Sequence, residues 1–309
     1  MRTVFMGTPD FAVNTLEAIL AAGHEVAAVV TQPDKPKGRG KDLGQSPVKE
    51  CAIAHGLTVY QPVKVREPEF VELLRNLAPE VIVVVAFGQI LPKSILELPK
   101  YGCINVHASL LPKYRGAAPI QWAVIDGEKE SGVAIQQMDE GLDTGDILMM
   151  VKTPLAPDET GGSLFDRLAV MGAKALTDTL AGLEAGTIRP VPQQGESNYA
   201  GKLDKTLGHM DFKKSADELE RLIRGLNPWP SAYTALDGKT LKLWKAAVAE
   251  DGDGRKPGEI FAVTRHSFRI QTGKGSLEIL ELQLEGKKRM DTESFLRGYR
   301  LEDGMECDG

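Results

Sequence analysis

An amide and an imidazole lie two residues apart in the segment from Cys103 to Pro119. The segment reads Cys-Ile-Asn-Val-His-Ala-Ser-Leu-Leu-Pro-Lys-Tyr-Arg-Gly-Ala-Ala-Pro, and an apolar run leads directly into Asn105 and His107. Because side chains alternate along a strand, Asn105 and His107 should share one face. Ligands of open α/β sheets bind at the carboxyl ends of strands. The pair is therefore expected where a sheet carries its chemistry.

A second segment supplies carboxylates. Residues 138–146 read Met-Asp-Glu-Gly-Leu-Asp-Thr-Gly-Asp and follow an apolar run that we interpret as another strand. Gly141 and Gly145 would let this loop double back on a ligand. A carboxylate near His107 would favour the charged imidazolium. An amide, an imidazole and a carboxylate brought together suit acyl transfer.

These residues resemble a known family. Asn105-x-His107, followed by Ser109-Leu-Leu-Pro112 and then Asp139-x-Gly-x-Asp143-Thr-Gly145, resembles the folate-dependent formyltransferases. Two further segments extend the resemblance over essentially the whole chain: Met6-Gly-Thr-Pro-Asp-Phe-Ala-Val13 and Arg224-Gly-Leu-Asn-Pro-Trp-Pro230. Each piece alone is a weak signal, whereas the combination is specific.

The resemblance implies transfer of the formyl group of 10-formyltetrahydrofolate to the α-amine of methionine esterified to initiator tRNA. The amine would attack the formyl carbon directly, so neither a covalent enzyme intermediate nor a metal is expected. Asn105 would hold the formyl oxygen, and protonated His107 would stabilise the oxyanion. Asp143 would favour that protonated form and help to remove the amine proton. One such donor can lower a barrier by ~2.7–4 kcal/mol.

The folate site is expected on two apolar stretches. The resemblance places Ser109, Leu110, Leu111 and Pro112 against the cofactor. Phe87-Gly88-Gln-Ile90-Leu91 follows an apolar strand that ends at Ala86, and it could form a wall for the pterin; simple core packing explains it equally well. Asp139 is the remaining candidate, and a solvated acidic loop is its alternative.

The loop at residues 32–42 is the candidate for RNA contacts. Its basic residues alternate with Pro and Gly, a pattern that opposes regular structure and could order on a phosphate backbone: Lys35, Lys37, Arg39 and Lys41. The resemblance implies that this loop enters the acceptor stem, with Arg39 as its key arginine. A solvated surface loop is the alternative. Phe11 could line a pocket for the methionine side chain or belong to a helix core.

Composition narrows the class of protein. A chain of 309 residues predicts about two domains. The net charge of −6 argues against a general binder of polyanions, so RNA contacts must be local. The three cysteines, Cys51, Cys103 and Cys307, form no disulfide framework or CxxC zinc pattern. With no signal peptide or long apolar run, we expect a cytoplasmic protein, and nothing indicates an obligate dimer.

The order of elements predicts the architecture. Up to residue 186, strands alternate with helices, which predicts a Rossmann-like, doubly wound, mostly parallel sheet. Ser46 and Glu50 suggest a capping box, and Ser163 could cap a long helix at 161–186. Residues 215–225 should form a helix. Short alternating runs after it predict a small antiparallel, OB-like barrel, with strands near 240–248, 258–263, 267–271 and 277–284 and a closing helix at 292–298.

The predicted organisation is a catalytic domain (1–186), a linker (187–205) and a C-terminal tRNA-binding β-barrel (206–309). Two alternatives remain open at this point. The first is a formyltransferase that acts on a small amine, such as glycinamide ribonucleotide or an amino sugar nucleotide; it would need neither the basic loop nor the barrel. The second is a non-catalytic folate- or RNA-binding module, against which the intact Asn105, His107 and Asp143 argue.

Overall fold

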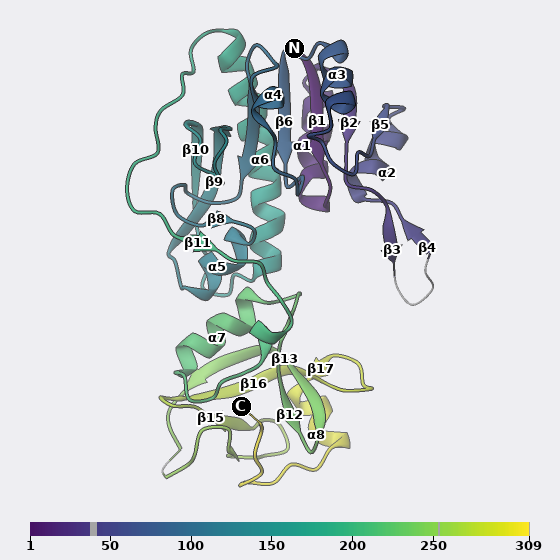
Figure 1. Cartoon of the computed structure of the whole chain (residues 1–309). Coiled ribbons are helices and arrows are strands. Elements are labelled where there is room, and N and C mark those ends of the chain that lie inside the picture. Colours follow the sequence, from purple (N-terminus) through teal and green to yellow (C-terminus); the bar gives the residue numbers. More distant parts are fainter. Residues whose placement is uncertain (38–41, 253, 309) are drawn as a thin grey trace. The chain divides into compact units, whose positions relative to one another are not determined.

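The chain forms two compact units. The computed structural model describes residues 1–37, 42–252 and 254–308 (Figure 1). Unit 1 comprises Met1–Pro119, Glu130–Pro154 and Phe165–Ala200, and unit 2 comprises Ile120–Lys129, Leu155–Leu164 and Gly201–Gly309. No helix among the described residues has the length and apolar character that a bilayer span requires.

Unit 1 is built on a sheet whose described strands run in the order β10-β9-β7-β6-β1-β2-β5 (Figure 1). The five strands from β7 to β5 are parallel, whereas β9 is antiparallel to β7, and β10 to β9. The predicted Rossmann-like, mostly parallel sheet is confirmed. The strand bounds are β1 (Arg2–Gly7), β2 (Glu25–Val30), β5 (Val59–Tyr60), β6 (Val81–Val85), β7 (Cys103–His107), β9 (Glu130–Gln137) and β10 (Ile147–Pro154).

Helices connect these strands. Their bounds are α1 (Val13–Ala21, after the 3-10 turn Asp10–Ala12), α2 (Pro47–Ala54), α3 (Pro68–Leu77), α4 (Lys93–Leu96), α5 (Pro119–Ile125) and α6 (Gly161–Glu184). One sheet face is apolar and packs against α3 and α4; its buried cluster includes Val4, Met6, Ile82 and Val84. Gly172 of α6 meets β7, where an added Cβ would lie 2.8 Å from Cγ1 of Val106.

Two helix starts differ in detail from the sequence prediction. Ser46 caps α2 by accepting from the backbone N–H of Lys49. Glu50 is the fourth residue of α2, one position beyond the place from which a capping-box glutamate reaches back. Ser163 is not the cap of α6 but the third residue of that helix. It exchanges hydrogen bonds with Thr160, whose hydroxyl accepts from the Ser163 N–H at 3.0 Å.

Unit 2 contains the predicted antiparallel barrel. Its described strands run in the order β12-β13-β16-β15-β14, and β17 also pairs with β16. The bounds are β12 (Ala232–Leu236), β13 (Lys239–Ala249), β14 (Ile260–Phe261), β15 (Arg269–Gln271), β16 (Ser276–Leu284) and β17 (Met290–Asp291). The segment at 304–308 lies between the two edges. Ile260 N–H donates to Met305 O (2.7 Å), and Asp308 N–H donates to Ala235 O (3.0 Å), which closes the barrel.

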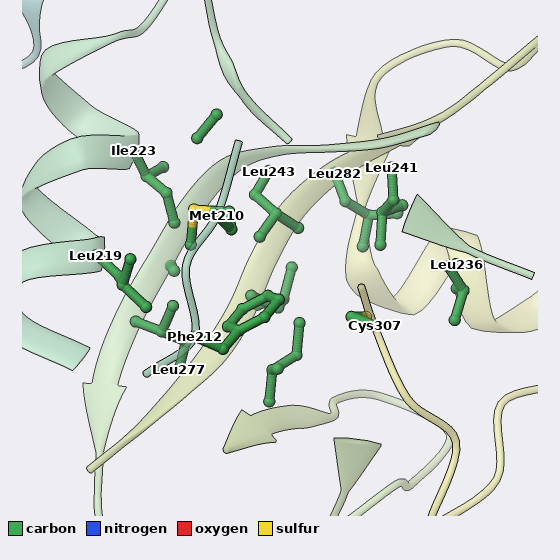
Figure 2. Close-up of a cluster of buried hydrophobic side chains, with 14 of the residues drawn as sticks. Met210, Phe212, Leu219, Ile223, Leu236, Leu241, Leu243, Leu277, Leu282 and Cys307 are labelled. Atoms are coloured by element: carbon green, nitrogen blue, oxygen red, sulfur yellow. The ribbon is translucent and has the colours of Figure 1, made fainter. Parts of the chain in front are cut away.

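A helix covers the core of this barrel. In α7 (Ala216–Gly225), Leu219 and Ile223 point into a buried cluster that includes Phe212 and Cys307 (Figure 2). Ser215 begins α7 with a complete capping box. The predicted closing helix is α8 (Thr292–Gly298). The barrel therefore has its own apolar core.

The segment that we predicted as a linker takes part in unit 1. Val191 forms an antiparallel bridge with Ile147, and β11 (Tyr199–Ala200) pairs in parallel with β8 (Arg115–Gly116). Two short segments from the first half of the chain, 120–129 and 155–164, belong to unit 2. The division in space thus does not follow a single cut in the sequence, because strands recruit partners from distant segments. The remaining ladder, β3 (Lys35–Lys37) with β4 (Asp42–Gly44), forms the base of the basic loop.

Candidate active site

His107 ends β7 and is 6% exposed. Its Nε2 lies 2.8 Å from the carbonyl oxygen of Tyr114. A carbonyl can only accept, so Nε2 carries a hydrogen and Nδ1 is the nitrogen that can gain or lose a proton. Nδ1 lies 3.6 Å from Oδ1 of Asp143, slightly beyond hydrogen-bond distance. The imidazole is thus fixed through one nitrogen and presents the other to a carboxylate.

Asp143 reaches His107 by a loop that folds back. Strand β9 is antiparallel to β7 and its last residue, Gln137, pairs with Ile104, so the loop after β9 begins beside the amino end of β7. Asp143 adopts a left-handed φ of +53°. Its Oδ2 accepts from the N–H of Gly116 (2.8 Å) and its Oδ1 from Nε2 of Gln136 (3.0 Å). Non-glycine residues in this conformation are concentrated at functional sites.

The loop glycines serve close approach. A Cβ on Gly145 would lie 1.8 Å from the carbonyl oxygen of Gln137, and one on Gly141 would lie 2.0 Å from Oγ1 of Thr144. The left-handed turn itself is taken by Asp143. Glycine is therefore required where the loop passes the end of β9, for a steric reason rather than for the turn.

Two glutamines that the sequence patterns did not single out also hold Asp143 in place. Gln136 pairs with Asn105 across the β7–β9 ladder, which brings its amide to Asp143. Gln193 donates to the carbonyl oxygens of Asp143 and Gly145, both at 2.8 Å, and accepts from Arg115. Gln193 lies in the stretch predicted as a linker. Its polar composition was compatible with solvent exposure, so no sequence signal placed it here.

The Ser109–Pro112 segment lies beside the site. Asn105 and Ser109 are 9% and 1% exposed, and the Ser109 hydroxyl donates to the carbonyl of Lys113 (2.6 Å). Leu111 is buried, whereas Leu110 is partly exposed and packs close to Gly132. Pro112 is also buried. Leu110 is therefore the leucine of this segment with surface available to a ligand.

The second apolar stretch, residues 87–91, likewise contains both buried and exposed side chains. Ile90 is 81% exposed, whereas Phe87 and Leu91 belong to the core beside α3 and α4. The Phe87 carbonyl accepts from the side chains of Thr8 and Gln32, each at 3.2 Å. Gly88 follows it with a φ of +88°. Asp139 is exposed, and its Oδ1 accepts from Gly141 N–H and the Thr144 hydroxyl, so it organises its own loop.

The candidate RNA loop has a defined base. Lys35 is exposed on β3, and Lys37 follows on the same strand; Arg39 and Lys41 lie outside the described residues. Beside β3, Lys49 of α2 donates to Asp34 (2.6 Å) and Gln61 (2.8 Å). The hydrogen bond from Lys49 holds the pKa of Asp34 below its usual range.

Phe11 is 6% exposed and meets the ring of Phe165 edge to face, with centroids 5.2 Å apart. This aromatic pair belongs to the interior of unit 1. Its position agrees with the helix-core alternative, and the small exposed fraction is what remains for a ligand.

The family follows from comparison with known proteins. Residues 1–180 match the formyl transferase family, and residues 202–300 match the C-terminal domain of formyl transferases. The chain belongs to the formyl transferase family, as the sequence resemblance predicted.

Individual relatives are more specific. The chain is 64% identical over 311 residues to a methionyl-tRNA formyltransferase of Lachnospira eligens, which covers 99% of each chain. It is 60% identical to the methionyl-tRNA formyltransferase of Agathobacter rectalis, with 98% of each covered. Among solved structures, an N-formyltransferase from Helicobacter canadensis in complex with folinic acid and dTDP-3-aminofucose is similar in fold. Its TM-score is 0.65 at 21% identity, covering 94% of this chain and all of that one.

Proposed function

We propose that this chain transfers the formyl group of 10-formyltetrahydrofolate to the amine of methionyl initiator tRNA and so makes N-formylmethionyl-tRNA for translation initiation. The observation that carries the proposal is the approach of Asp143 to His107, at 3.6 Å, with buried Asn105 two residues before His107 on the same strand. Identity of 64% to a relative named for this activity, along the whole chain, supports the choice of acceptor.

The buried polar groups suit attack of an amine on a formyl carbon. Asn105 donates to the formyl oxygen, whose negative charge grows in the transition state. Protonated His107 stabilises that charge through Nδ1, because Nε2 is already committed to the Tyr114 carbonyl. Asp143, whose Oδ1 lies 3.6 Å from that Nδ1, receives the amine proton through water. The bond between the formyl carbon and N10 of the folate then breaks, and this proton passes to N10 as tetrahydrofolate leaves. Donors fixed before substrate binds need little reorganisation during reaction.

The folate co-substrate fits the polar and apolar groups at this edge of unit 1. Gln136 is 1% exposed, and its Oε1 has no hydrogen-bond donor among the residues that the structure describes. A buried amide oxygen without a donor costs about 1–3 kcal/mol, which a ligand N–H would recover. Leu110 and Ile90 offer apolar surface to the co-substrate, and neither is fully buried. These three residues support a folate site in unit 1.

The basic loop and the barrel bind the acceptor, methionyl-tRNA. Lys35, Lys37, Arg39 and Lys41 contact the acceptor stem, and the C-terminal domain at 206–309 holds the body of the tRNA. Phe11 borders the methionyl group. The protein acts as a monomer in the cytoplasm, where initiator tRNA is available.

The test is incorporation of a labelled formyl group from 10-formyltetrahydrofolate. Methionyl-tRNA, free methionine, glycinamide ribonucleotide and an amino sugar nucleotide serve as parallel acceptors. We expect label on methionyl-tRNA alone, and at least about a 100-fold lower kcat for His107→Ala, because a positioned donor to the oxyanion contributes 10²–10³. Label on a small amine instead would reject the tRNA assignment. Normal turnover by His107→Ala, with folding verified by circular dichroism, would remove the histidine from the mechanism.

A further inference from the structure

A thiol, an imidazole and a carboxylate meet on the helical surface of unit 1, outside the cluster of Asn105, His107 and Asp143. Glu17 lies on α1, Cys51 lies on α2, and His55 ends α2. Cys51 and His55 are four residues apart, so they share one face of the helix. One ligand atom from each of the three side chains lies within 4.8 Å of the other two. We propose that these residues bind a divalent zinc ion.

The chemistry of the three donors favours zinc. A thiolate, an imidazole nitrogen and a carboxylate oxygen are the ligand types that this ion takes from proteins. A hard ion such as Mg²⁺ prefers oxygen ligands alone. Three protein ligands leave one tetrahedral position for water. The ligand set comes from two helices, which is why spacing in the sequence did not reveal it: only the Cys-x-x-x-His half is local.

The distances already approach those of a tetrahedral site. Sγ of Cys51 lies 3.3 Å from Oε1 of Glu17, and Nε2 of His55 lies 2.9 Å from Oε2 of Glu17. With Zn–S near 2.3 Å and Zn–N or Zn–O near 2.0 Å, neighbouring ligand atoms are about 3.3–3.5 Å apart. These two pairs therefore need adjustments of a few tenths of an ångström at most, and the third pair, Sγ of Cys51 and a ring nitrogen of His55, lies within 4.8 Å. The side chains of Glu17 and His55 are 49% and 40% exposed, so an ion can enter from solvent.

Without a metal, the same three groups form a hydrogen-bonded cluster. Burial, followed by the hydrogen bond to Glu17, raises the pKa of the Cys51 thiol to about 12. The hydrogen bond from His55 lowers the pKa of Glu17. Zinc would replace the thiol proton, which leaves for solvent, and would replace the hydrogen bonds with metal–ligand bonds. This site does not depend on the proposed activity, because none of its residues takes part in the transfer.

Zinc and cobalt binding test the proposal on the untagged full chain after treatment with a chelator. We expect one Zn²⁺ per chain by calorimetry, and a thiolate-to-cobalt charge-transfer absorption when Co²⁺ is added instead. Cys51→Ser should weaken zinc binding by at least about tenfold and abolish that absorption. Glu17→Gln should weaken binding while retaining the absorption, because the thiolate remains.

The matched control is His266→Ala. His266 also faces a glutamate, with Nδ1 3.4 Å from Oε2 of Glu293, but this pair includes no thiol. Zinc should bind to His266→Ala as it does to the unmodified chain, and should raise the melting temperature of both but not of Cys51→Ser. Equal zinc affinity of Cys51→Ser and the unmodified chain would overturn the proposal. So would cobalt binding without the thiolate absorption.

Discussion

Asp143 is held beside His107 by amides from three separate parts of the chain. The N–H of Gly116 and the side chain of Gln136 bind its carboxylate, and Gln193 binds its backbone carbonyl. The carboxylate therefore has little freedom to turn away from the imidazole. Since its backbone is also left-handed, the loop would relax if these partners were removed.

Gln193→Ala tests the most distant of these partners. The change removes two donations, to the carbonyls of Asp143 and Gly145, without touching a proposed catalytic side chain. A displacement of about 1 Å at a reacting group can cost 10²-fold in rate. We expect kcat for formyl transfer to fall about 10- to 100-fold while the KM for tRNA changes little. Steady-state kinetics measure both quantities.

Gln194→Ala is the matched control for that experiment. Gln194 is the next residue along the chain, is of the same type and is exposed. Its variant should retain normal kinetics and the same melting temperature. If Gln193→Ala also retained normal kcat, Gln193 would be a structural contact without influence on the reaction.

Asp143 and Gln193 differ in whether the sequence alone could identify them as residues of the candidate site. Asn105, His107 and Asp143 could be singled out as candidates because each lies in a short motif whose residue types suit one reaction. Gln136 and Gln193 could not, since a glutamine in a polar stretch is compatible with solvent. Their contacts arise from strand register and from pairing between segments some 50 residues apart.

At the scale of elements, the short ladder of β8 with β11 joins the site to the segment predicted as a linker. Gly116 lies in this ladder with a φ of +110°. An added Cβ would lie 2.5 Å from the ring of Tyr199 and 2.7 Å from the carbonyl oxygen of Ala200. The same glycine donates its N–H to Asp143. Gly116 therefore supports both the ladder and the carboxylate that we propose to take part in the transfer.

Gly116→Ala should consequently lower both the stability of the protein and its rate of formyl transfer. Left-handed backbone costs an alanine roughly 1–2 kcal/mol, and overpacking adds typically 1–3 kcal/mol. We expect the free energy of unfolding to fall by about 2–5 kcal/mol, measured by denaturant titration followed by circular dichroism. Formyl transfer should decline at temperatures where the variant is still folded.

Gly186→Ala separates backbone strain from steric conflict. Gly186 has a φ of +69°, but nothing lies within 4 Å of an added Cβ. This variant should lose only about 1–2 kcal/mol and keep its activity. Equal destabilisation of the two variants would mean that β11 yields to the added methyl group, and that the ladder does not constrain Asp143.

The helices and strands were largely predictable from the sequence, but the pairing between strands was less so. The helix predicted at 215–225 is found as α7, Ala216–Gly225, with Ser215 as its cap. The direction of β9 was not evident, because an apolar run reads the same in a parallel and an antiparallel strand. Closure of the barrel by the segment at 304–308 was also not evident. Its pairing consists of isolated bridges with no strand-like run of residues.

At the scale of the whole molecule, the two units draw on interleaved segments. Residues 120–129 and 155–164 belong to unit 2 although the barrel begins after residue 200. A deletion of residues 206–309 would therefore leave the segments 120–129 and 155–164 in the shortened chain without the rest of the unit to which they belong. Loss of activity after such a deletion would not separate tRNA binding from misfolding. Substitutions on the surface of the full chain are the better test of tRNA contacts.

Net charge makes such a test informative. The chain carries −6, with −6 from residues 1–200 and 0 from residues 201–309. A polyanion is thus repelled at long range, and binding must come from local cations. Each phosphate contact contributes about −0.9 to the slope of log K against log salt on duplex nucleic acid. Lys35→Ala and Arg39→Ala should each reduce the slope for tRNA binding by about one contact, with folate affinity unchanged.

Lys174→Ala provides the comparison, because Lys174 is exposed on α6 and paired with Asp178 at 2.6 Å. It removes the same formal charge from unit 1 and so changes the net charge equally. If affinity followed net charge alone, all three variants would weaken tRNA binding to the same extent. If local phosphate contacts govern binding, Lys174→Ala should retain the full salt slope while Lys35→Ala and Arg39→Ala do not. An unchanged salt slope for Lys35→Ala and Arg39→Ala would mean that the loop at 32–42 is a solvated surface loop. Another part of the molecule would then have to recognise tRNA.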